Sequence, residues 1–426
     1  MRVKVLIPKL QGTVQAPPSK SFMQRVCALA LLNRGSTLVR NPGVSQDDLA
    51  ALDIIQSMGA RIDYDQENHS LRIASDGCTQ WSGMLNARES GLAARMFIPL
   101  AALSNQEVTI TGEGTLLKRS MQWLMDVLPE LNVQVNSLNG LLPMSVKGPL
   151  LPKSLTVDAS QSSQYISGLI MALAYTTHEP VQLRLFNIVS LSYLQLTIRL
   201  MKHFGYMLDW NGENEIIIQP LQHCTENKQV EADIEGDWSA AAALLVAGAI
   251  GGRVSLAGLT YPSVQGDAAV LSVLQDAGAQ VEILQNKITV SHADTLQAFN
   301  YHAEHTPDVF PVLAVLALYA QGTSYISGVS RLWNKESNRA NAVQALVKAL
   351  GGTAEIREDV MHIRGPVSVN EVHMHSFHDH RIVMAAAIAS AGSNTQVTID
   401  DAQAVEKSYP HFFKDISKLG AQVLIT

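Results

Sequence analysis

A strand followed by a loop recurs six times along the 426 residues of the chain, and this repeat restricts the possible folds more than any other feature. The copies begin at Gly35, Asn105, Glu179, Gly251, Gly322 and Asn394, which lie 70, 74, 72, 71 and 72 residues apart. Such regular spacing indicates one structural unit repeated six times.

An alanine-rich apolar segment precedes each strand, and its residues are apolar on nearly every helical face. These segments are residues 21–32, 91–103, 162–175, 238–250, 308–320 and 380–391. Helices of this kind are buried. Most strands are followed by a second helix that ends at a glycine, which suits a left-handed helix C-cap, although the second copy, residues 124–135, lacks this glycine.

Each repeat therefore predicts helix, strand, loop, helix and one or more further strands. Six such repeats most simply form two domains of three repeats with buried helices. A one-dimensional solenoid is the alternative, but solenoid repeats usually span roughly 20–45 residues.

Composition excludes several classes of protein. Hydrophobic residues make up 47% of the chain and charged residues 16%, so disorder is excluded. The net charge of −7 argues against a general nucleic-acid binder and requires any anion site to use locally gathered cations. The chain has three cysteines, Cys27, Cys78 and Cys224, and they lack the spacing of zinc or redox sites. No signal peptide or membrane span is evident. We therefore expect a soluble cytoplasmic protein with reduced thiols.

Polar residues gather where each buried helix is predicted to begin. They are Ser19, Lys20, Ser21 and Arg25; Ser90, Gly91 and Arg95; Ser162, Ser163 and Gln164; Asp237; Asp308; and His380 and Arg381. Helix N-termini expose N–H groups and a positive dipole end, so several that converge form an anion site. Ordinary helix capping is the alternative for the serines, Asp237 and Asp308. Arg25 and Arg95 border apolar faces and need an anionic partner.

A second polar group follows the strands. Its members are Asp48, Arg119, Ser190, Tyr193, Gln265, Asp267, Lys335, Glu336, Arg339 and Lys407. We expect both groups to face one cleft. For residues 334–339 a solvated helix face is the alternative, and for Tyr193 simple packing.

The chain contains an ordered series of motifs: PSKSFMQR, SGLAAR, GEGTLLKR, SQSSQY, EGDWSAA, PD at 307–308, KESNR, HDHR and EKSYP. Together they resemble the 5-enolpyruvylshikimate-3-phosphate synthase family of enolpyruvyl transferases. The resemblance spans the chain and implies an α/β fold of two lobes, each with three βαβαββ repeats around a pseudo-threefold axis and buried helices, an inside-out α/β barrel. It implies one lobe from residues 1–17 and 235–426, a second from residues 18–234, and an active site in the cleft between them.

The resemblance also implies a reaction, in which the enolpyruvyl group of phosphoenolpyruvate is transferred to the 5-hydroxyl of shikimate 3-phosphate through a tetrahedral intermediate, in the shikimate pathway to chorismate and aromatic amino acids. The implied phosphoenolpyruvate ligands are Lys20, Gly91, Arg119, Gln164, Arg339, Arg381 and Lys407. The implied shikimate 3-phosphate ligands are Ser21, Arg25, Ser162, Ser163, Gln164, Ser190, Tyr193, Asp308 and Lys335.

Asp308 is the implied base and Glu336 the acid that protonates carbon, with Lys20 a third catalytic residue; Lys407 and His380 could share the proton steps. The family implies no cofactor, metal, nucleic acid or membrane partner, a monomer, and glyphosate as a possible inhibitor. Two alternatives remain. UDP-N-acetylglucosamine enolpyruvyl transferase normally has a reactive cysteine in the loop that here spans residues 112–120 without one, and a non-catalytic relative would be expected to lack Asp308 or Glu336.

Overall fold

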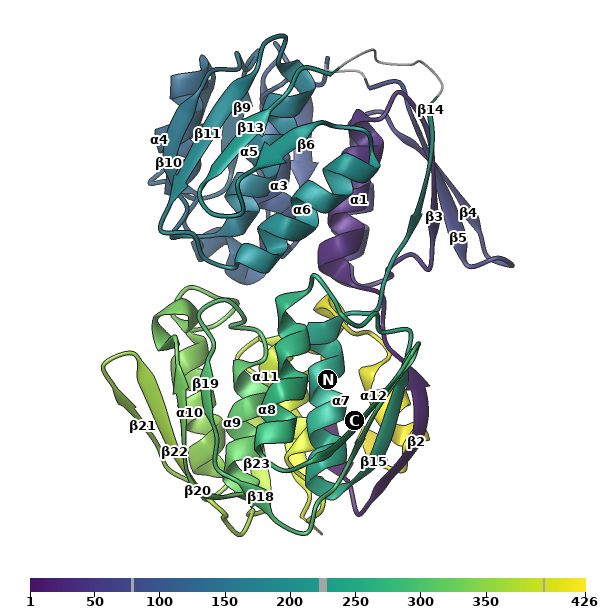
Figure 1. The fold of residues 1–426 in the computed structure, drawn as a ribbon, viewed down its shortest axis with the longest axis vertical. Helices are drawn as coiled ribbons and strands as arrows, with labels where there is room; N and C mark the ends of the chain where they lie inside the picture. Colours follow the sequence, from purple (N-terminus) through teal and green to yellow (C-terminus); the bar gives the residue numbers. More distant parts are fainter. Residues whose placement is uncertain (78–79, 222–227, 394) are drawn as a thin grey trace. The chain divides into compact units, whose positions relative to one another are not determined.

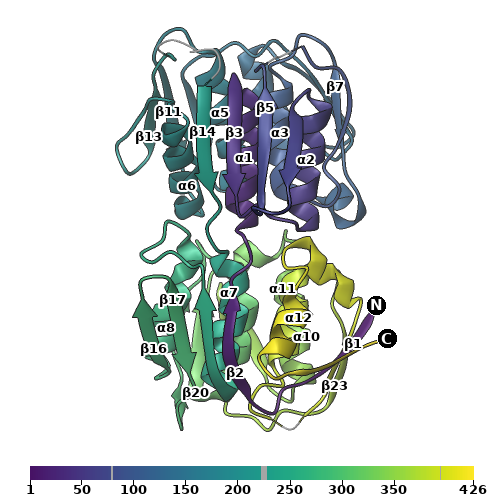
Figure 2. The same ribbon diagram turned by 90° about the vertical axis from the view of Figure 1, so that its right-hand side faces the viewer.

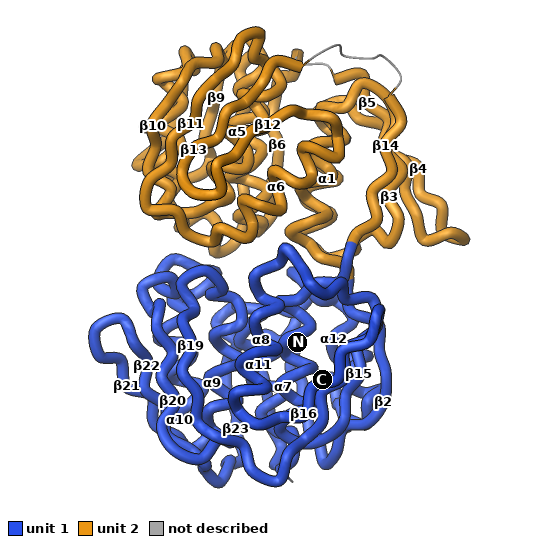
Figure 3. Tube along the Cα trace, in the orientation of Figure 1, with its two compact units in different colours: residues 1–17, 235–426 blue, residues 18–234 orange. Residues whose placement is uncertain are grey.

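The computed structural model describes residues 1–77, 80–221, 228–393 and 395–426, so Cys78, Cys224 and the repeat start Asn394 lie outside the described residues. The chain divides into two compact units (Figure 3). Unit 1 comprises Met1–Pro17 and Glu235–Thr426, and unit 2 comprises Pro18–Ile234. Cys27 is a buried free thiol, as expected for a cysteine in an apolar helix.

Unit 2 contains three repeats of strand, helix, strand, helix, strand and strand. The first is β14 (Lys228–Asp233), α1 (Lys20–Leu32), β3 (Gly35–Arg40), α2 (Gln46–Ser57), β4 (Arg61–Asp65) and β5 (Ser70–Ser75). The second is β6 (Gly83–Asn86), α3 (Gly91–Ala101), β7 (Val108–Thr111), α4 (Gln122–Val127), β8 (Gln134–Ser137) and β9 (Met144–Lys147), with 3₁₀ helices η1 (Gly114–Lys118) and η2 (Leu128–Leu131). The third is β10 (Leu155–Asp158), α5 (Ser163–Thr176), β11 (Val181–Phe186), α6 (Leu191–His203), β12 (Leu208–Trp210) and β13 (Glu215–Ile218).

Unit 1 repeats the same order three times. Its first repeat is β2 (Leu10–Gln15), α7 (Trp238–Gly251), β15 (Gly252–Ala257), η3 (Gly266–Ala269), α8 (Val270–Asp276), β16 (Gln280–Leu284) and β17 (Lys287–Ser291). Its second is β18 (Leu296–Gln297), β19 (Asn300–His302), α9 (Phe310–Tyr319), β20 (Ala320–Ser327), η4 (Val329–Leu332), α10 (Arg339–Ala349), β21 (Ala354–Arg357) and β22 (Val360–Gly365). Its third is β23 (Val372–His375), α11 (His380–Ile388), β24 (Val397–Asp400), η5 (Ala402–Lys407), α12 (Phe412–Lys418), β25 (Gln422–Ile425) and β1 (Arg2–Leu6).

Each repeat forms its own sheet, and all six sheets follow one pairing rule. The strands before and after the buried helix run parallel, as β6 and β7 do, and the remaining pairs, such as β7 with β9 and β8 with β9, are antiparallel. The buried helix packs against the sheet of its own repeat, as α7 does against β15 and β17.

Two strands pair in a different repeat from the one they precede in the chain. Strand β2 precedes α1 but pairs with β15 in unit 1 (Figure 1). Strand β14 precedes α7 but pairs with β3 in unit 2 (Figure 2). The N-terminal strand β1 pairs with β24 and β25, so the two ends of the chain complete one sheet. Unit 1 is therefore held together by long-range backbone hydrogen bonds.

The first helix of each repeat is buried, as predicted. Helices α7 and α9 are buried along almost their whole length, and α7, α9 and α11 contact one another inside unit 1 (Figure 1). Contact between α7 and α11, from the first and third repeats, means that the repeats close on one another, whereas in a solenoid each repeat contacts only its neighbours. No helix within the described ranges is long and apolar enough to cross a membrane.

The predicted left-handed C-caps are confirmed. The glycines that end the second helix of five repeats have φ between 87° and 109°; they are Gly59, Gly205, Gly278, Gly351 and Gly420. In the repeat that lacks the glycine, Asn132 takes this position with φ 65°. Asparagine is the side chain that best tolerates this conformation, so all six repeats make the same turn.

Candidate active site

In unit 1 a single buried arginine holds three carboxylates. Arg339, the first residue of α10, has a fully buried side chain. Its Nε donates to Asp379 Oδ2 at 2.9 Å, its Nη1 to Asp308 Oδ1 at 2.8 Å, and its Nη2 to Glu336 Oε2 at 2.7 Å. Burial disfavours the charged guanidinium, but the three carboxylates outweigh burial and raise the pKa of Arg339 above its usual value.

Asp308 is not a helix cap, because α9 begins two residues later and its N-cap residue is Val309. The Asp308 side chain is 27% exposed, and besides Arg339 it lies 3.6 Å from Lys335 Nζ and 3.5 Å from Arg381 Nη2. Burial favours the neutral acid, but the cations outweigh it and hold the pKa of Asp308 well below its usual value; in order of strength they are Lys335, Arg381 and Arg339. Asp308 is therefore a carboxylate with an exposed edge inside a ring of cations.

For Lys335 the effect of burial on the pKa outweighs the effect of the neighbouring charges. Burial lowers its pKa to about 8, although Asp308 favours the charged amine. The Lys335 ammonium can thus lose its proton within an ordinary working range of pH.

The start of α11 contributes a second buried arginine. Arg381 is 2% exposed, and its Nε and Nη1 have no hydrogen-bond partner within the described part of the chain. The neighbouring residue Asp379 caps α11 by accepting from the Arg381 amide at 2.9 Å while it also holds Arg339. His380 is 1% exposed, and Lys407, which ends η5, is 6% exposed. Unpaired buried N–H groups of an arginine at a helix N-terminus are suited to an oxyanion.

In unit 2 the start of α1 is fixed by an acidic partner. Lys20, its first residue, lies with Nζ 2.9 Å from Asp47 Oδ2 in the first turn of α2. Asp48 completes a capping box with Ser45, and burial raises the pKa of the Asp48 carboxyl to about 7. Asp48 is thus a structural residue, whereas Asp47 positions a predicted ligand.

Arg25 is buried among neutral polar groups. Its Nε donates to Thr197 Oγ1 at 2.8 Å, its Nη1 to the Ser21 carbonyl oxygen at 2.7 Å and its Nη2 to Ser167 Oγ at 3.3 Å, and the Tyr193 ring lies 5.7 Å from its guanidinium carbon. Burial lowers the pKa of Arg25 to about 10, and no carboxylate pairs with it in the described residues. An anionic ligand would supply the missing countercharge.

Gly91, the first residue of α3, lies under two guanidinium groups. A Cβ at this position would come within 2.7 Å of Arg119 Nη1 and 3.0 Å of Arg95 Nη1. Arg95 in turn donates to Gln164 Oε1 at 2.8 Å and lies over the Tyr165 ring. The absence of a side chain at Gly91 is therefore what lets Arg119 approach the helix N-terminus.

Several of the predicted polar residues are helix caps. Ser90, Ser162 and Asp237 each accept a backbone N–H in the first turn of the following helix. Ser163 follows Ser162 as the first residue of α5, and Ser190 precedes α6 with φ 52°. Gln265 binds the backbone around α7 through Trp238 N and Gly236 O. The capping interpretation is thus correct for Ser90, Ser162 and Asp237 and wrong for Asp308.

Three partners of the site were not predicted from the sequence. They are Asp379, which binds Arg339; Asp47, which binds Lys20; and Thr197, which binds Arg25. Asp379 stands beside a predicted ligand directly before an apolar helix, and this N-cap pattern is the signal that could have identified it. The other two are a helix-start acid and an ordinary helix residue, which carry no comparable signal.

The structure therefore brings several of the predicted residues together within each unit. In unit 1, Asp308, Lys335, Glu336, Arg339 and Arg381 form one cluster. In unit 2, Gly91, Arg119 and Gln164 are linked through Arg95, and Arg25, Ser21 and Tyr193 form a neighbouring group on α1 and α6.

Comparison with solved structures first defines the class: the fold is that of the enolpyruvyl transferases. The chain is similar over 100% of both lengths to the EPSP synthase of Acinetobacter baumannii, with a TM-score of 0.81 at 22% identity. It is similar over 100% of its length and 98% of the other to the enolpyruvyl transferase NikO from Streptomyces tendae, with a TM-score of 0.79 at 16% identity. The predicted fold class is confirmed.

Sequence similarity identifies the family more narrowly. Residues 6–416 match the family described as EPSP synthase (3-phosphoshikimate 1-carboxyvinyltransferase). A protein of Methanocorpusculum labreanum named 3-phosphoshikimate 1-carboxyvinyltransferase is 32% identical over 424 residues, which is 99% of each chain. The chain belongs to the EPSP synthase family, as its motifs predicted.

Proposed function

We propose that the protein transfers the enolpyruvyl group of phosphoenolpyruvate to the 5-hydroxyl of shikimate 3-phosphate and releases phosphate. Family membership over nearly the whole chain supports this reaction. The structural observation that carries the proposal is the pair Asp308 and Glu336, held by the buried Arg339 beside further cations. Two carboxylates among cations can exchange protons with a substrate that is itself anionic.

Phosphoenolpyruvate is the proposed ligand of Lys20, Gly91, Arg119, Gln164, Arg339, Arg381 and Lys407. The partnerless N–H groups of Arg381 support this assignment, because a phosphate or carboxylate would satisfy them. The close approach of Arg119 to Gly91 supports it also, because the guanidinium then adds its charge to the N-terminus of α3. Arginine forks match both planar carboxylates and phosphates.

Shikimate 3-phosphate is the proposed ligand of Ser21, Arg25, Ser162, Ser163, Gln164, Ser190, Tyr193, Asp308 and Lys335. The lowered pKa of Arg25 supports this role, since a buried guanidinium without a carboxylate partner gains most from a bound anion. The N-terminus of α5 at Ser162 and Ser163 offers hydroxyl and amide donors for a phosphate.

Asp308 is the proposed base for the 5-hydroxyl proton. In the free protein the surrounding cations make its carboxylate a weak base. Bound phosphoenolpyruvate would share the charge of Arg339 and Arg381, so the carboxylate would recover basicity when the substrates are bound. Proton removal is thereby coupled to formation of the complete complex.

Glu336 is the proposed acid. As the 5-oxygen bonds to C2 of phosphoenolpyruvate, this acid delivers a proton to C3, and a tetrahedral intermediate with a methyl group results. Loss of one methyl proton back to the carboxylate then expels phosphate and regenerates the vinyl group. A carboxyl group that is 12% exposed and hydrogen-bonded to Arg339 can serve in both directions.

Two alternative functions are disfavoured by particular residues. The loop at residues 112–120 contains no cysteine, which argues against the UDP-N-acetylglucosamine enzyme. Asp308 and Glu336 are both present, and both accept hydrogen bonds from Arg339, which argues against a non-catalytic relative.

Location, assembly and inhibition belong to the same proposal. We place the protein in the cytoplasm as a monomer, with glyphosate as a possible inhibitor at the phosphoenolpyruvate ligands. We also expect shikimate 3-phosphate to compact the protein, so the radius of gyration in solution scattering should fall when this substrate is added.

The experiment that tests the assignment is phosphate release from phosphoenolpyruvate and shikimate 3-phosphate by wild type, Asp308→Asn and Glu336→Gln. Both variants keep the shape of the side chain and a hydrogen bond to Arg339, so both should fold. Each should lower kcat by a factor of about 10²–10⁴. Wild-type turnover in either variant would contradict the role given to that residue.

A further inference from the structure

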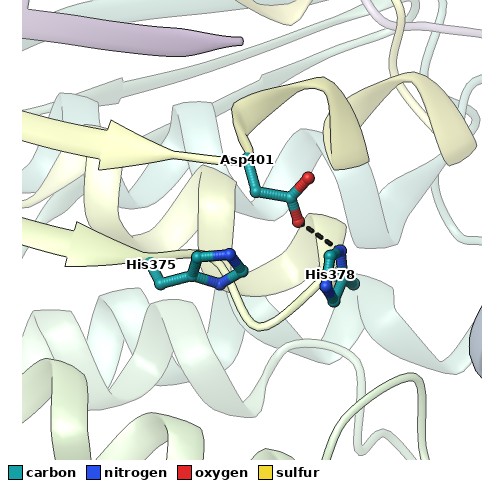
Figure 4. A group of neighbouring side chains, drawn as sticks. All are labelled: His375, His378 and Asp401. Carbon is teal, nitrogen blue, oxygen red and sulfur yellow. Dashed lines mark ion pairs between the residues drawn. The ribbon is translucent and has the colours of Figure 1, made fainter.

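Outside the proposed active site, three potential metal ligands lie together in unit 1. His375, His378 and Asp401 each offer one ligand atom, and these atoms all lie within 4.8 Å of one another (Figure 4). The sequence around the two histidines, VHMHSFHDH, contains four histidines in residues 373–380. Histidine-rich tracts of this kind are typical of metal binding.

The fold explains why these residues meet. His375 is the last residue of β23, and Asp401 directly follows β24, the parallel neighbour in which Asp400 pairs with His375. His378 belongs to the turn between β23 and α11. The two strands end at the same edge of the sheet, so the turn and the start of η5 lie side by side.

The turn holds His378 in a left-handed backbone conformation. Phe377 and His378 have φ of 58° and 57°, which is uncommon for two consecutive residues with side chains. Ser376 fixes the turn, because its hydroxyl accepts from His378 N at 3.2 Å and donates to Asp401 Oδ2 at 2.9 Å. Strained backbone of this kind is concentrated at ligand-binding positions.

Hydrogen bonds orient the Asp401 carboxylate, whereas the exposed His378 imidazole is able to change its position. Asp401 is 12% exposed and accepts from Ser376 and Gln403, whereas His378 is 61% exposed. His378 Nδ1 lies 2.6 Å from Asp401 Oδ2. Two ligands of a tetrahedral ion at about 2.0–2.1 Å stand roughly 3.3 Å apart, so His378 would retreat by less than about 1 Å.

His375 is the third potential ligand. Its Nδ1 accepts from Phe377 N at 2.8 Å, so this nitrogen bears the imidazole lone pair. A metal bound at this nitrogen would take over its lone pair, and the Phe377 amide of this exposed turn would then donate to water.

We propose that His375, His378 and Asp401 bind one divalent transition-metal ion, with zinc as the best match. Two imidazoles and one carboxylate suit zinc, and water would complete the tetrahedron. The ion would lie between His378 Nδ1 and Asp401 Oδ2, which are in direct contact in the free protein. It links the turn that leads into Arg381 with the 3₁₀ helix that ends at Lys407, and it acts by stabilising these segments.

The test is a titration of untagged, metal-free, full-length protein with zinc by calorimetry and with cobalt by visible absorption. We expect one ion per chain and a cobalt spectrum of tetrahedral type. His378→Asn, which tolerates the left-handed backbone, and His375→Gln should each weaken zinc binding by at least about tenfold. Zinc should raise the Tm of wild type more than that of either variant.

His373→Gln is the matched control. His373 lies on the same strand, is 56% exposed and pairs with Asp400 at 2.8 Å, but is not one of the three ligands. This variant should bind zinc as wild type does. The proposal is overturned if wild type does not bind zinc at millimolar concentration, if His378→Asn and His375→Gln bind as tightly as wild type, or if His373→Gln weakens binding as much as they do.

Discussion

Replacing Asp379 by asparagine tests whether the buried charge network of unit 1 is organised as described. Asp379 is fully buried, and its two carboxylate oxygens accept from Nε of Arg339 at 2.9 Å and from Nη2 at 3.2 Å. It also caps α11. Asparagine has nearly the same shape and caps helices equally well, so Asp379→Asn removes the charge and replaces one of the two acceptor oxygens that face Arg339 with an amide donor.

The magnitude follows from the burial of both partners. A hydrogen bond to a charged group contributes about 1.5–3 kcal/mol, and removing one partner of a buried ion pair costs about 3–5 kcal/mol. Two other carboxylates remain on Arg339, so we expect Asp379→Asn to lower the free energy of unfolding by about 2–3 kcal/mol. Asp379→Ala loses the cap as well and should cost about 1 kcal/mol more.

Urea unfolding followed by circular dichroism measures both values. Glu355→Gln is the control, because Glu355 is 64% exposed in its ion pair with Arg357, and a surface change of this kind should alter stability by no more than about 0.5 kcal/mol. If Asp379→Asn is as stable as that control, the network does not depend on the buried charge.

Three further predictions concern other residues. Gly91→Ala should leave stability nearly unchanged but raise the KM for phosphoenolpyruvate at least severalfold, because the new Cβ displaces the Arg119 guanidinium. An unchanged KM in steady-state kinetics would show that Arg119 does not bind this substrate. Burial raises the pKa of Asp48 to about 7, so folding takes up a proton and the free energy of unfolding falls as pH rises from about 4 to 7. Asp48→Asn should remove this pH dependence and should be more stable than wild type by up to about 4 kcal/mol at about pH 8. If urea unfolding shows the variant to be less stable than wild type at that pH, the reasoning is refuted. Because the pKa of Lys335 is lowered to about 8, kcat/KM for shikimate 3-phosphate should fall above that pH as the ammonium is lost, and Lys335→Arg should move the fall to higher pH; identical pH profiles would contradict the assignment.

The helices and strands follow closely from local sequence patterns. The segment at residues 21–32 predicted a buried helix, which the structure has at Lys20–Leu32. The missing glycine of the second repeat is explained by Asn132, since the pattern was defined by glycine although asparagine can adopt the same conformation. The pairing of β2 with β15 and of β14 with β3 depends on contacts between distant segments, which periodicity does not encode.

The cations of the site could be predicted from the sequence, because buried helices rarely begin with arginine or lysine. Their partners were not, since Asp379 lies 40 residues from Arg339 and Asp47 lies 27 residues from Lys20 along the chain. An aspartate before an apolar helix can be a cap or a ligand, and only the position of α9 shows that Asp308 is no cap. The roles assigned to the individual ligands stay predictions.

The most direct test of the proposed reaction is phosphate release from phosphoenolpyruvate with shikimate 3-phosphate or UDP-N-acetylglucosamine as acceptor, with the product identified by proton NMR. We predict phosphate release and an enolpyruvyl ether with shikimate 3-phosphate alone. Release with the nucleotide sugar alone would contradict the assigned acceptor. Release with neither, from folded protein that still binds shikimate 3-phosphate, would contradict the proposed catalysis.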